Sequence, residues 1–149
     1  MNPTSEPFLN RELSWLEFNG RVLEEGLDPL RRPMDRLRFL AIFSSNLDEF
    51  FMIRMSGLWS QVRAGYAKED ASRNAPGKVL SACEERVRAL VPVQMQGLRE
   101  QVLPQLERSG VRFHDAESLP QELRAPLSRV FQEEFQPILT PMAVDPGRP

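Results

Sequence analysis

The chain has 149 residues, 41% of them hydrophobic and 27% charged, which is the composition of a soluble globular domain with a substantial core. Its 19 basic and 21 acidic residues give a net charge of −2, which argues against a polybasic surface for nucleic acid or anionic membranes. One cysteine and one histidine exclude an internal disulfide and a dense zinc cluster, and no apolar run approaches a transmembrane length. These features favour a cytoplasmic protein.

Two helices are predicted before residue 46. The first is expected to begin near Trp15, because Ser14 and Glu17 have the spacing of a capping box, and to end around Gly26. Its inward face carries residues at steps of three and four: Leu13, Leu16, Gly20, Leu23 and Leu27. The second helix is expected to begin at Pro33 and to stop at the serine pair 44–45. Its inward residues are Leu37, Leu40 and Ala41.

A third helix is predicted to begin at or just after Asn46, within the stretch FSSNLDEFFMIRM. Its main apolar stripe is Phe51, Met55, Leu58 and Val62, widened by Phe50, Ile53 and Trp59. A stripe of this width indicates burial against two neighbouring helices.

After a loop at 64–77, a long helical pattern covers residues 78–109. Its apolar positions are Leu80, Cys83, Val87, Leu90, Val91, Leu98, Val102 and Leu106. Pro92 and Pro104 interrupt the pattern and are expected to kink or split the helix, since each removes a backbone donor. Gly110 suits the residue just past the helix end, and 111–115 is expected to be a short extended piece.

A last helix is predicted after Ser118, which with Gln121 forms a second capping signal. Its apolar residues are Leu123, Leu127, Val130, Phe131 and Phe135. Residues 136–149 are apolar but rich in proline, so we expect an extended tail leading to a missing domain, and residues 1–9 are expected to be a flexible start. The predicted fold is a compact all-α bundle of four to five helices spanning 1–149.

Asn46 allows two interpretations. The simpler one is an N-cap, in which its side-chain oxygen accepts a backbone N–H while Glu49 completes the box and Asp48 suits the helix dipole. The alternative is a ligand contact, because a carboxamide matches the donor and acceptor edge of adenine. Two carboxylates in the first turn would repel a triphosphate, so this helix would meet the base of a nucleotide.

Other candidate groups carry less chemistry. Cys83 lies on an apolar helix face and is interpreted as an inert core thiol, so a Cys83–His114 nucleophile pair is not favoured. His114 is interpreted as an exposed loop residue. Six arginines are interleaved with apolar positions as on a solvated face: Arg31, Arg32, Arg36, Arg38, Arg54 and Arg63. Arg54 stands apart, because it lies in the most apolar stretch and needs an acidic or interdomain partner. No catalytic residue and no metal ligand is predicted.

Four segments together resemble the N-terminal domain of the type 1 polyphosphate kinases. They are RELSWLEFNGRVLEEGLD, RLRFLAIFSSNLDEFFMIRMSGL, REQVLPQLERSGVRF and FQEEFQPILTPMAVDP. The resemblance implies a helical domain of a phosphotransferase that moves the terminal phosphate of ATP reversibly to polyphosphate, with Mg²⁺ and through a phosphohistidine. It also implies that Asn46, which precedes LDEF, contacts ATP.

The resemblance places the phosphohistidine, the metal ligands and the phosphate-binding cations after Pro149, so the chain alone is expected to be inactive. The expected partners are the remaining domains of the same polypeptide, a second subunit in a homodimer or higher oligomer, and polyphosphate. The full-length enzyme could also associate with a membrane. The alternative from a different class is a helical protein-interaction module with no ligand site.

Overall fold

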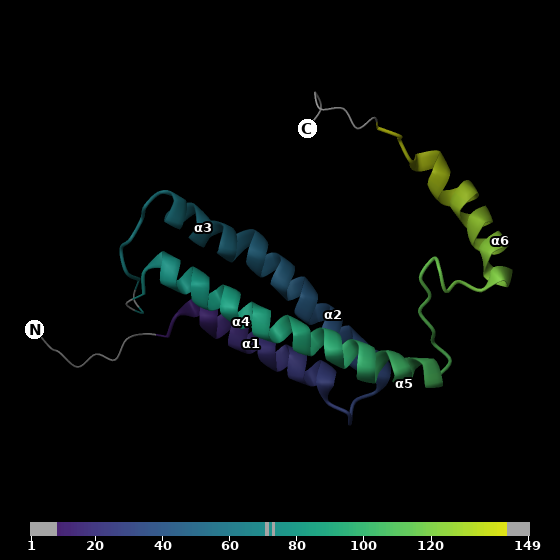
Figure 1. The fold of residues 1–149 in the computed structure, drawn as a ribbon, viewed down its shortest axis with the longest axis horizontal. Coiled ribbons are helices and arrows are strands. Elements are labelled where there is room, and N and C mark those ends of the chain that lie inside the picture. The colour runs from purple at the N-terminus through teal and green to yellow at the C-terminus, as the bar shows by residue number, and fades with distance from the viewer. Residues whose placement is uncertain (1–8, 71, 73, 143–149) are drawn as a thin grey trace, which may run out of the picture. The chain divides into compact units, whose positions relative to one another are not determined.

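A computed structural model describes residues 9–70, 72 and 74–142, and its described residues divide into two compact units after Arg112 (Figure 1). Only the last residue of the predicted flexible start at 1–9 is described, and the tail beyond 142 lies outside the described residues. Within the described part of the chain there are four continuous helical runs and no strand. The predicted all-α class is confirmed.

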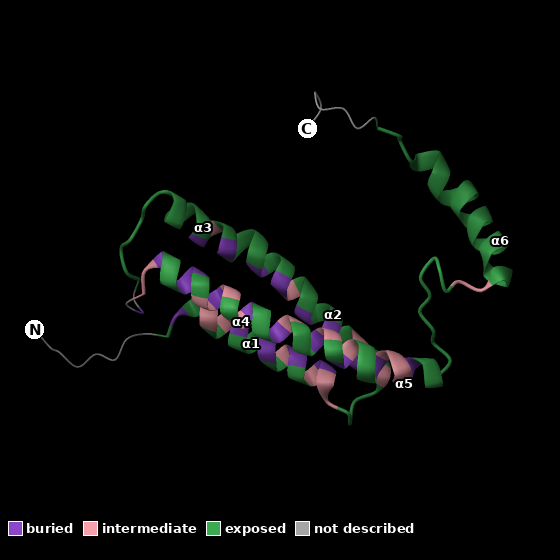
Figure 2. Ribbon diagram, in the orientation of Figure 1, coloured by how far each residue is buried: buried purple, intermediate pink, exposed green. Residues whose placement is uncertain are grey.

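The first unit contains three of these runs lying side by side. They are α1 (Arg11–Leu27), the run α2 (Pro33–Glu49), η1 (Phe50–Met55) and α3 (Ser56–Arg63), and the run α4 (Pro76–Gly97), η2 (Leu98–Val102) and α5 (Leu103–Arg108). The elements η1 and η2 are π-helical turns. Figure 2 shows the buried residues of each run on the side that faces the other runs.

The N-terminus of α1 lies four residues before the predicted one. Asn10 is the N-cap, and its side-chain oxygen accepts from the backbone N–H groups of Glu12 and Leu13 at 3.1 and 3.0 Å. The predicted capping box at Ser14 is therefore wrong. Asn10 also donates to Asp70 at 2.9 Å, which ties the helix start to a loop sixty residues away.

The predicted break near Asn46 is also wrong. The run from Pro33 to Arg63 continues through it, with Glu49 and Phe50 both in the right-handed helical region. Ser44 and Asn46 instead meet amides from other helices, since Gln94 donates to the Ser44 hydroxyl at 2.6 Å and Asn46 donates to Asn19 at 2.9 Å. Polar residues that look like a helix stop can thus serve as interhelical hydrogen-bonding groups.

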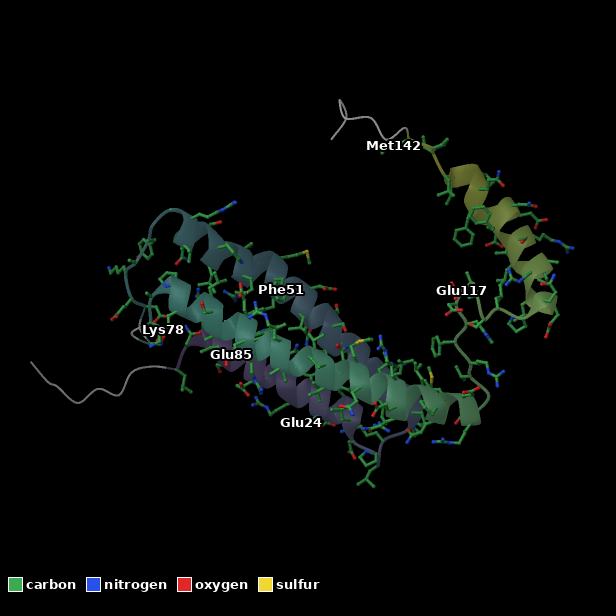
Figure 3. All side chains as sticks on the ribbon, viewed as in Figure 1. Glu24, Phe51, Lys78, Glu85, Glu117 and Met142 are labelled. Atoms are coloured by element: carbon green, nitrogen blue, oxygen red, sulfur yellow. The ribbon has the colours of Figure 1, made fainter. Side chains whose placement is uncertain are left out.

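The π-helical turn η1 changes which face of this run is buried. Phe50 and Met55 are both 1% exposed although they are five positions apart, a spacing that suits the wider turn of a π-helix rather than an α-helix. Phe51, labelled in Figure 3, and Val62 were expected in the core but are partly exposed, at 43% and 37%. Arg54 points away from the core for the same reason and is exposed. Ala41, earlier in the same run, was expected to face inward and is also exposed.

The third run continues past both of its internal prolines. Pro92 lies inside α4, and Pro104 lies in the first turn of α5 just after the π-helical turn η2. Neither proline splits the run. Gly110 closes it with φ of +85°, while its N–H donates to Glu107 and that of Val111 donates to Leu106. This pair of bonds is a Schellman motif, as the glycine predicts.

The apolar core of the first unit draws on all three runs. Its buried residues are Leu16, Leu23, Leu40, Phe43, Leu47, Phe50, Met55, Leu58, Val79, Leu80, Cys83, Val87, Leu90, Val102 and Leu106. Cys83 is fully buried, as predicted. The loop that joins α3 to α4 covers residues 64–75, so α4 begins two residues earlier than the sequence pattern suggests.

Arg36 corrects the interpretation of the arginines as a solvated set, because it is 0% exposed. Its guanidinium donates to the carbonyls of Gly26 and Leu27 and to the side chains of Gln101 and Gln105, at 2.7 to 3.1 Å. It therefore supplies donors and positive charge to the last carbonyls of α1, where a helix lacks internal partners and favours cations.

The second unit contains the fourth run, made of α6 (Gln121–Val130), η3 (Phe131–Phe135) and η4 (Gln136–Ile138). α6 begins after Pro120 with no side-chain cap, so the predicted cap at Ser118 is wrong. The Ser118 hydroxyl accepts from the Asp115 N–H instead, in a turn at 116–118 that follows the predicted extended piece at 111–115. The predicted apolar residues are all 39–51% exposed. They are Leu123, Leu127, Val130, Phe131 and Phe135.

Candidate functional site

A small cavity opens where the start of α1 meets the end of α2 and η1. Its volume is about 210 Å³. The lining residues are Trp15, Phe18, Asn46, Glu49, Phe50, Ile53 and Arg54. Asn46 and Arg54, the two residues that the sequence singles out, thus line one cavity, and Asn46 is only partly buried, so a ligand can reach its side chain.

Aromatic rings supply one wall of this cavity. Trp15 and Phe50 stack with centroids 4.8 Å apart and planes inclined by 13°. Phe50 is buried and holds the stack in the core, whereas Phe18 is 49% exposed at the mouth. Flat aromatic surfaces of this kind favour planar ligands, because a ring can be stacked on them without loss of hydrogen bonds.

An amide relay supplies the polar part of the cavity. Asn46 donates from Nδ2 to the Asn19 side-chain oxygen at 2.9 Å, and Asn19 donates from its own Nδ2 to the Phe43 carbonyl at 3.2 Å. Asn19 is 0% exposed, so this chain of bonds runs from the cavity into the core. The side-chain oxygen and the second N–H of Asn46 have no protein partner among the described residues.

The charged groups of the cavity are Glu49 and Arg54, both exposed. Neither forms an ion pair within the described part of the chain. Because α2 begins at Pro33, Asp48 and Glu49 do not lie in a first helical turn. The helix-dipole reasoning that assigned this site to a base rather than to phosphate therefore fails. The features that favour a base at this site are therefore the Asn46 amide and the aromatic rings.

Two other features of the described residues bear on where a site could lie, a second cavity and the Cys83 thiol. A larger cavity of about 390 Å³ beside the loop before α4 has lining groups of both charges, among them Glu12, Lys68 and Asp70. Burial raises the pKa of the Cys83 thiol to about 11, with a smaller effect from the charge of Glu12. A thiol held neutral in this way does not suit a nucleophile.

His114 is exposed in the second unit, with Nδ1 3.0 Å from the Ser118 carbonyl. Within the described residues, no three His, Cys, Asp or Glu side chains gather to hold a metal ion. None of the helices searched there is both long and apolar enough to cross a membrane.

Sequence reasoning selected Asn46 and missed the residues of α1 that surround it. Trp15, Phe18 and Asn19 lie in the segment SWLEFN at positions i, i+3 and i+4, which is one face of a helix. Two aromatic residues and an amide on one face are a signal that could have identified the second half of the cavity. The partner of each amide depends on helix packing and could not be identified from that spacing.

Three comparisons with known proteins give concordant results. Residues 8–114 match the family model described as the polyphosphate kinase N-terminal domain. Polyphosphate kinases of Halalkalibacterium halodurans and of Synechocystis sp. are 47% and 44% identical to the chain, over 94% and 95% of its length. The crystal structure of polyphosphate kinase from Porphyromonas gingivalis aligns with a TM-score of 0.78 and 33% identity over 97% of the chain. In each case the chain spans 20% of the relative.

Proposed function

Because this chain belongs to the polyphosphate kinase N-terminal domain family, we propose that it is one domain of an enzyme that transfers the terminal phosphate of ATP reversibly to polyphosphate. The chain covers a fifth of the length of its relatives. We therefore assign the phosphohistidine, the Mg²⁺ ligands and the phosphate-binding cations to the rest of the polypeptide. We also propose a cytoplasmic location for the enzyme, because its proposed substrate is ATP.

The contribution that we propose for this domain is to bind the adenine end of ATP through Asn46. The observation that carries the proposal is the cavity in which a partly buried amide lies beside stacked aromatic rings. A carboxamide with a free oxygen and a free N–H can accept from the 6-amino group of adenine and donate to the neighbouring ring nitrogen. Trp15 and Phe18 offer apolar surface for the face of the same base.

The dimensions of the cavity indicate that it holds only a part of the nucleotide. Pockets for whole small molecules have volumes of roughly 300–1,000 Å³, whereas this one has about 210 Å³. A space of this size suits a single ring system. The ribose and phosphates would then extend onto the other domains of the enzyme.

The second unit supports a further role in contacts between domains. The apolar side chains of α6 are exposed in this chain, although side chains of this kind spaced on one helix face are typical of a packed helix. We propose that they pack against the polypeptide that follows residue 149. A second subunit of a homo-oligomer is the other partner that we propose for the domain.

The test of the ligand site compares two substrates in the full-length enzyme. The natural substrate is ATP, and the analogue is purine riboside triphosphate, which lacks the 6-amino group. In the unmodified enzyme we expect kcat/KM to be roughly 3–10-fold higher for ATP, because one hydrogen bond is worth about 0.5–1.5 kcal/mol. In the Asn46→Ala variant the two substrates should become equal, since the partner of the amino group is gone.

A matched control is Gln94→Met. Gln94 is another buried amide, and it bonds to α2, the helix that holds Asn46, but it does not line the cavity. This variant should lose stability and keep the preference for ATP. If Asn46→Ala retains the full preference, the domain does not read the base at this residue. That outcome would favour the alternative, a helical interaction module without a ligand site, for which the exposed apolar face of α6 is the supporting observation.

A further inference from the structure

We propose that Asn19 is a positioning residue, which fixes the orientation of the Asn46 amide and thereby the preference for a 6-amino over a 6-oxo purine. The proposal rests on the proposed contact between Asn46 and the base of ATP. Asn19 itself is fully buried and does not line the cavity, so it acts only through Asn46.

The orientation of Asn19 follows from its contact with the backbone. The Phe43 carbonyl, 3.2 Å from the Asn19 side chain, can only accept a hydrogen bond. Asn19 must therefore direct its NH₂ group toward Phe43, and its oxygen faces the other way. With no solvent exposure, a reversed amide would place two oxygens in contact and leave a buried polar group without a hydrogen-bonding partner, which disfavours that orientation.

The orientation of Asn46 follows in turn. The Asn19 oxygen, 2.9 Å from Asn46, needs a donor, so Asn46 must present its NH₂ group to it. This leaves the Asn46 oxygen as an acceptor and one N–H as a donor for a ligand, each in a fixed position. The 6-amino group of adenine is a donor and the ring nitrogen next to it is an acceptor, which matches those positions. On the same edge a 6-oxo purine presents two acceptors, O6 and N7, so it has no donor for the Asn46 oxygen.

Gln94 shows what a purely structural amide does in this bundle. It is buried, and it donates to the Leu40 carbonyl at 2.9 Å and to the Ser44 hydroxyl at 2.6 Å, both on α2. Its bonds thus join α4 to α2 and end away from the cavity. Asn19 joins α1 to the same helix, but its bonds continue to a side chain that lines the cavity.

The kinetic test uses the full-length enzyme with ATP and inosine triphosphate, the 6-oxo analogue. In the Asn19→Leu variant, which keeps the size of the side chain, the Asn46 amide can rotate. We expect KM for ATP to rise and the ratio of kcat/KM for ATP to that for inosine triphosphate to fall by roughly 3–10-fold, the value of one hydrogen bond. The kcat with ATP and the KM for polyphosphate should stay unchanged.

The control for lost stability is again Gln94→Met, which should keep the substrate ratio. An unchanged ratio in Asn19→Leu, or an equal fall in Gln94→Met, would overturn the positioning role. The Asn46→Ala variant separates this result from the proposed function. If Asn46→Ala loses the ratio and Asn19→Leu keeps it, only the role of Asn19 fails, and if Asn46→Ala keeps it, the contact with the base fails.

A second measurement needs no variant. In NMR spectra of the unmodified chain, both Asn19 side-chain protons should exchange slowly with solvent because the side chain is fully buried and one of them bonds to the Phe43 carbonyl. The Asn46 proton that bonds to the Asn19 oxygen should also exchange slowly. The remaining Asn46 proton should exchange quickly. If both Asn46 protons exchange as fast as those of free asparagine, the relay does not exist.

Discussion

Two glycines on α1 allow a sharp test of how closely the helices pack. A Cβ added at Gly26 would lie 2.7 Å from Leu40 Cδ2 and 3.2 Å from the Leu40 backbone nitrogen, whereas one added at Gly20 would meet nothing closer than Arg86 Nη2 at 3.6 Å. In both positions alanine improves helix propensity by up to about 1 kcal/mol. Only at Gly26 does it also force α1 away from α2, and overpacking of this kind costs about 1–3 kcal/mol.

We therefore expect opposite signs for the two substitutions. Gly20→Ala should raise the free energy of unfolding by about 0.5–1 kcal/mol, and Gly26→Ala should lower it by about 0.5–2 kcal/mol. Chemical denaturation followed by circular dichroism measures both, with an unchanged denaturant slope as the sign of an unaltered fold. If Gly26→Ala is as stable as Gly20→Ala, the close approach of the two helices at Leu40 is wrong.

Four further results are expected. Arg36→Met should lower the free energy of unfolding by about 2–4 kcal/mol in denaturant titrations, because four acceptors lose their donor; an unchanged midpoint would contradict the buried network. Because the pKa of Cys83 rises from 9.0 to about 11 on folding, the thiol stabilises the fold below pH 9 and loses this effect as the pH rises to 11. Cys83→Ala should therefore flatten the dependence of the free energy of unfolding on pH between 9 and 11. A disulfide reagent at pH 8 should react with the thiol only when the chain unfolds. Removal of residues after Arg112 should leave the melting temperature of the first unit unchanged, since every core residue precedes it; a large fall would show that the second unit contributes to the core. Calorimetry with the isolated chain should detect no ATP binding at micromolar concentrations, because one or two hydrogen bonds worth about 1–3 kcal/mol do not offset the entropy of association; tight binding would mean that the site is self-contained.

Apolar periodicity predicted the helical content well, because burial of one face is a local property of the sequence. Leu16, Leu23, Leu40 and Leu58 all lie in the core where the pattern placed them. The resemblance to the polyphosphate kinases likewise depended on contiguous motifs, and the comparisons confirmed it. The role of Asn46 as an ATP contact remains a prediction.

The errors at polar residues share one physical cause: a polar side chain can take several roles, and its partner in the folded chain decides between them. A helix cap is the simpler interpretation of Asn46 from the sequence, because the sequence does not show Asn19 beside it, 27 positions away. Arg36 was assigned to solvent because its acceptors on α1 and α5 are brought together only by folding. The π-helical turn from Phe50 to Met55 could not be predicted from a period of 3.6, and it moved Phe51 out of the core.

The π-helical turn η1 also determines which helices the two halves of its run contact. The wider turn rotates the helix beyond it, so the half that holds Asn46 packs mainly against α1 and the half that holds Leu58 packs mainly against α4. One continuous helical run thus packs against two neighbouring helices through two different faces. Deleting a single residue between Phe50 and Met55 would rotate α3 relative to α2, so only one of the two helices could keep the face that it now buries.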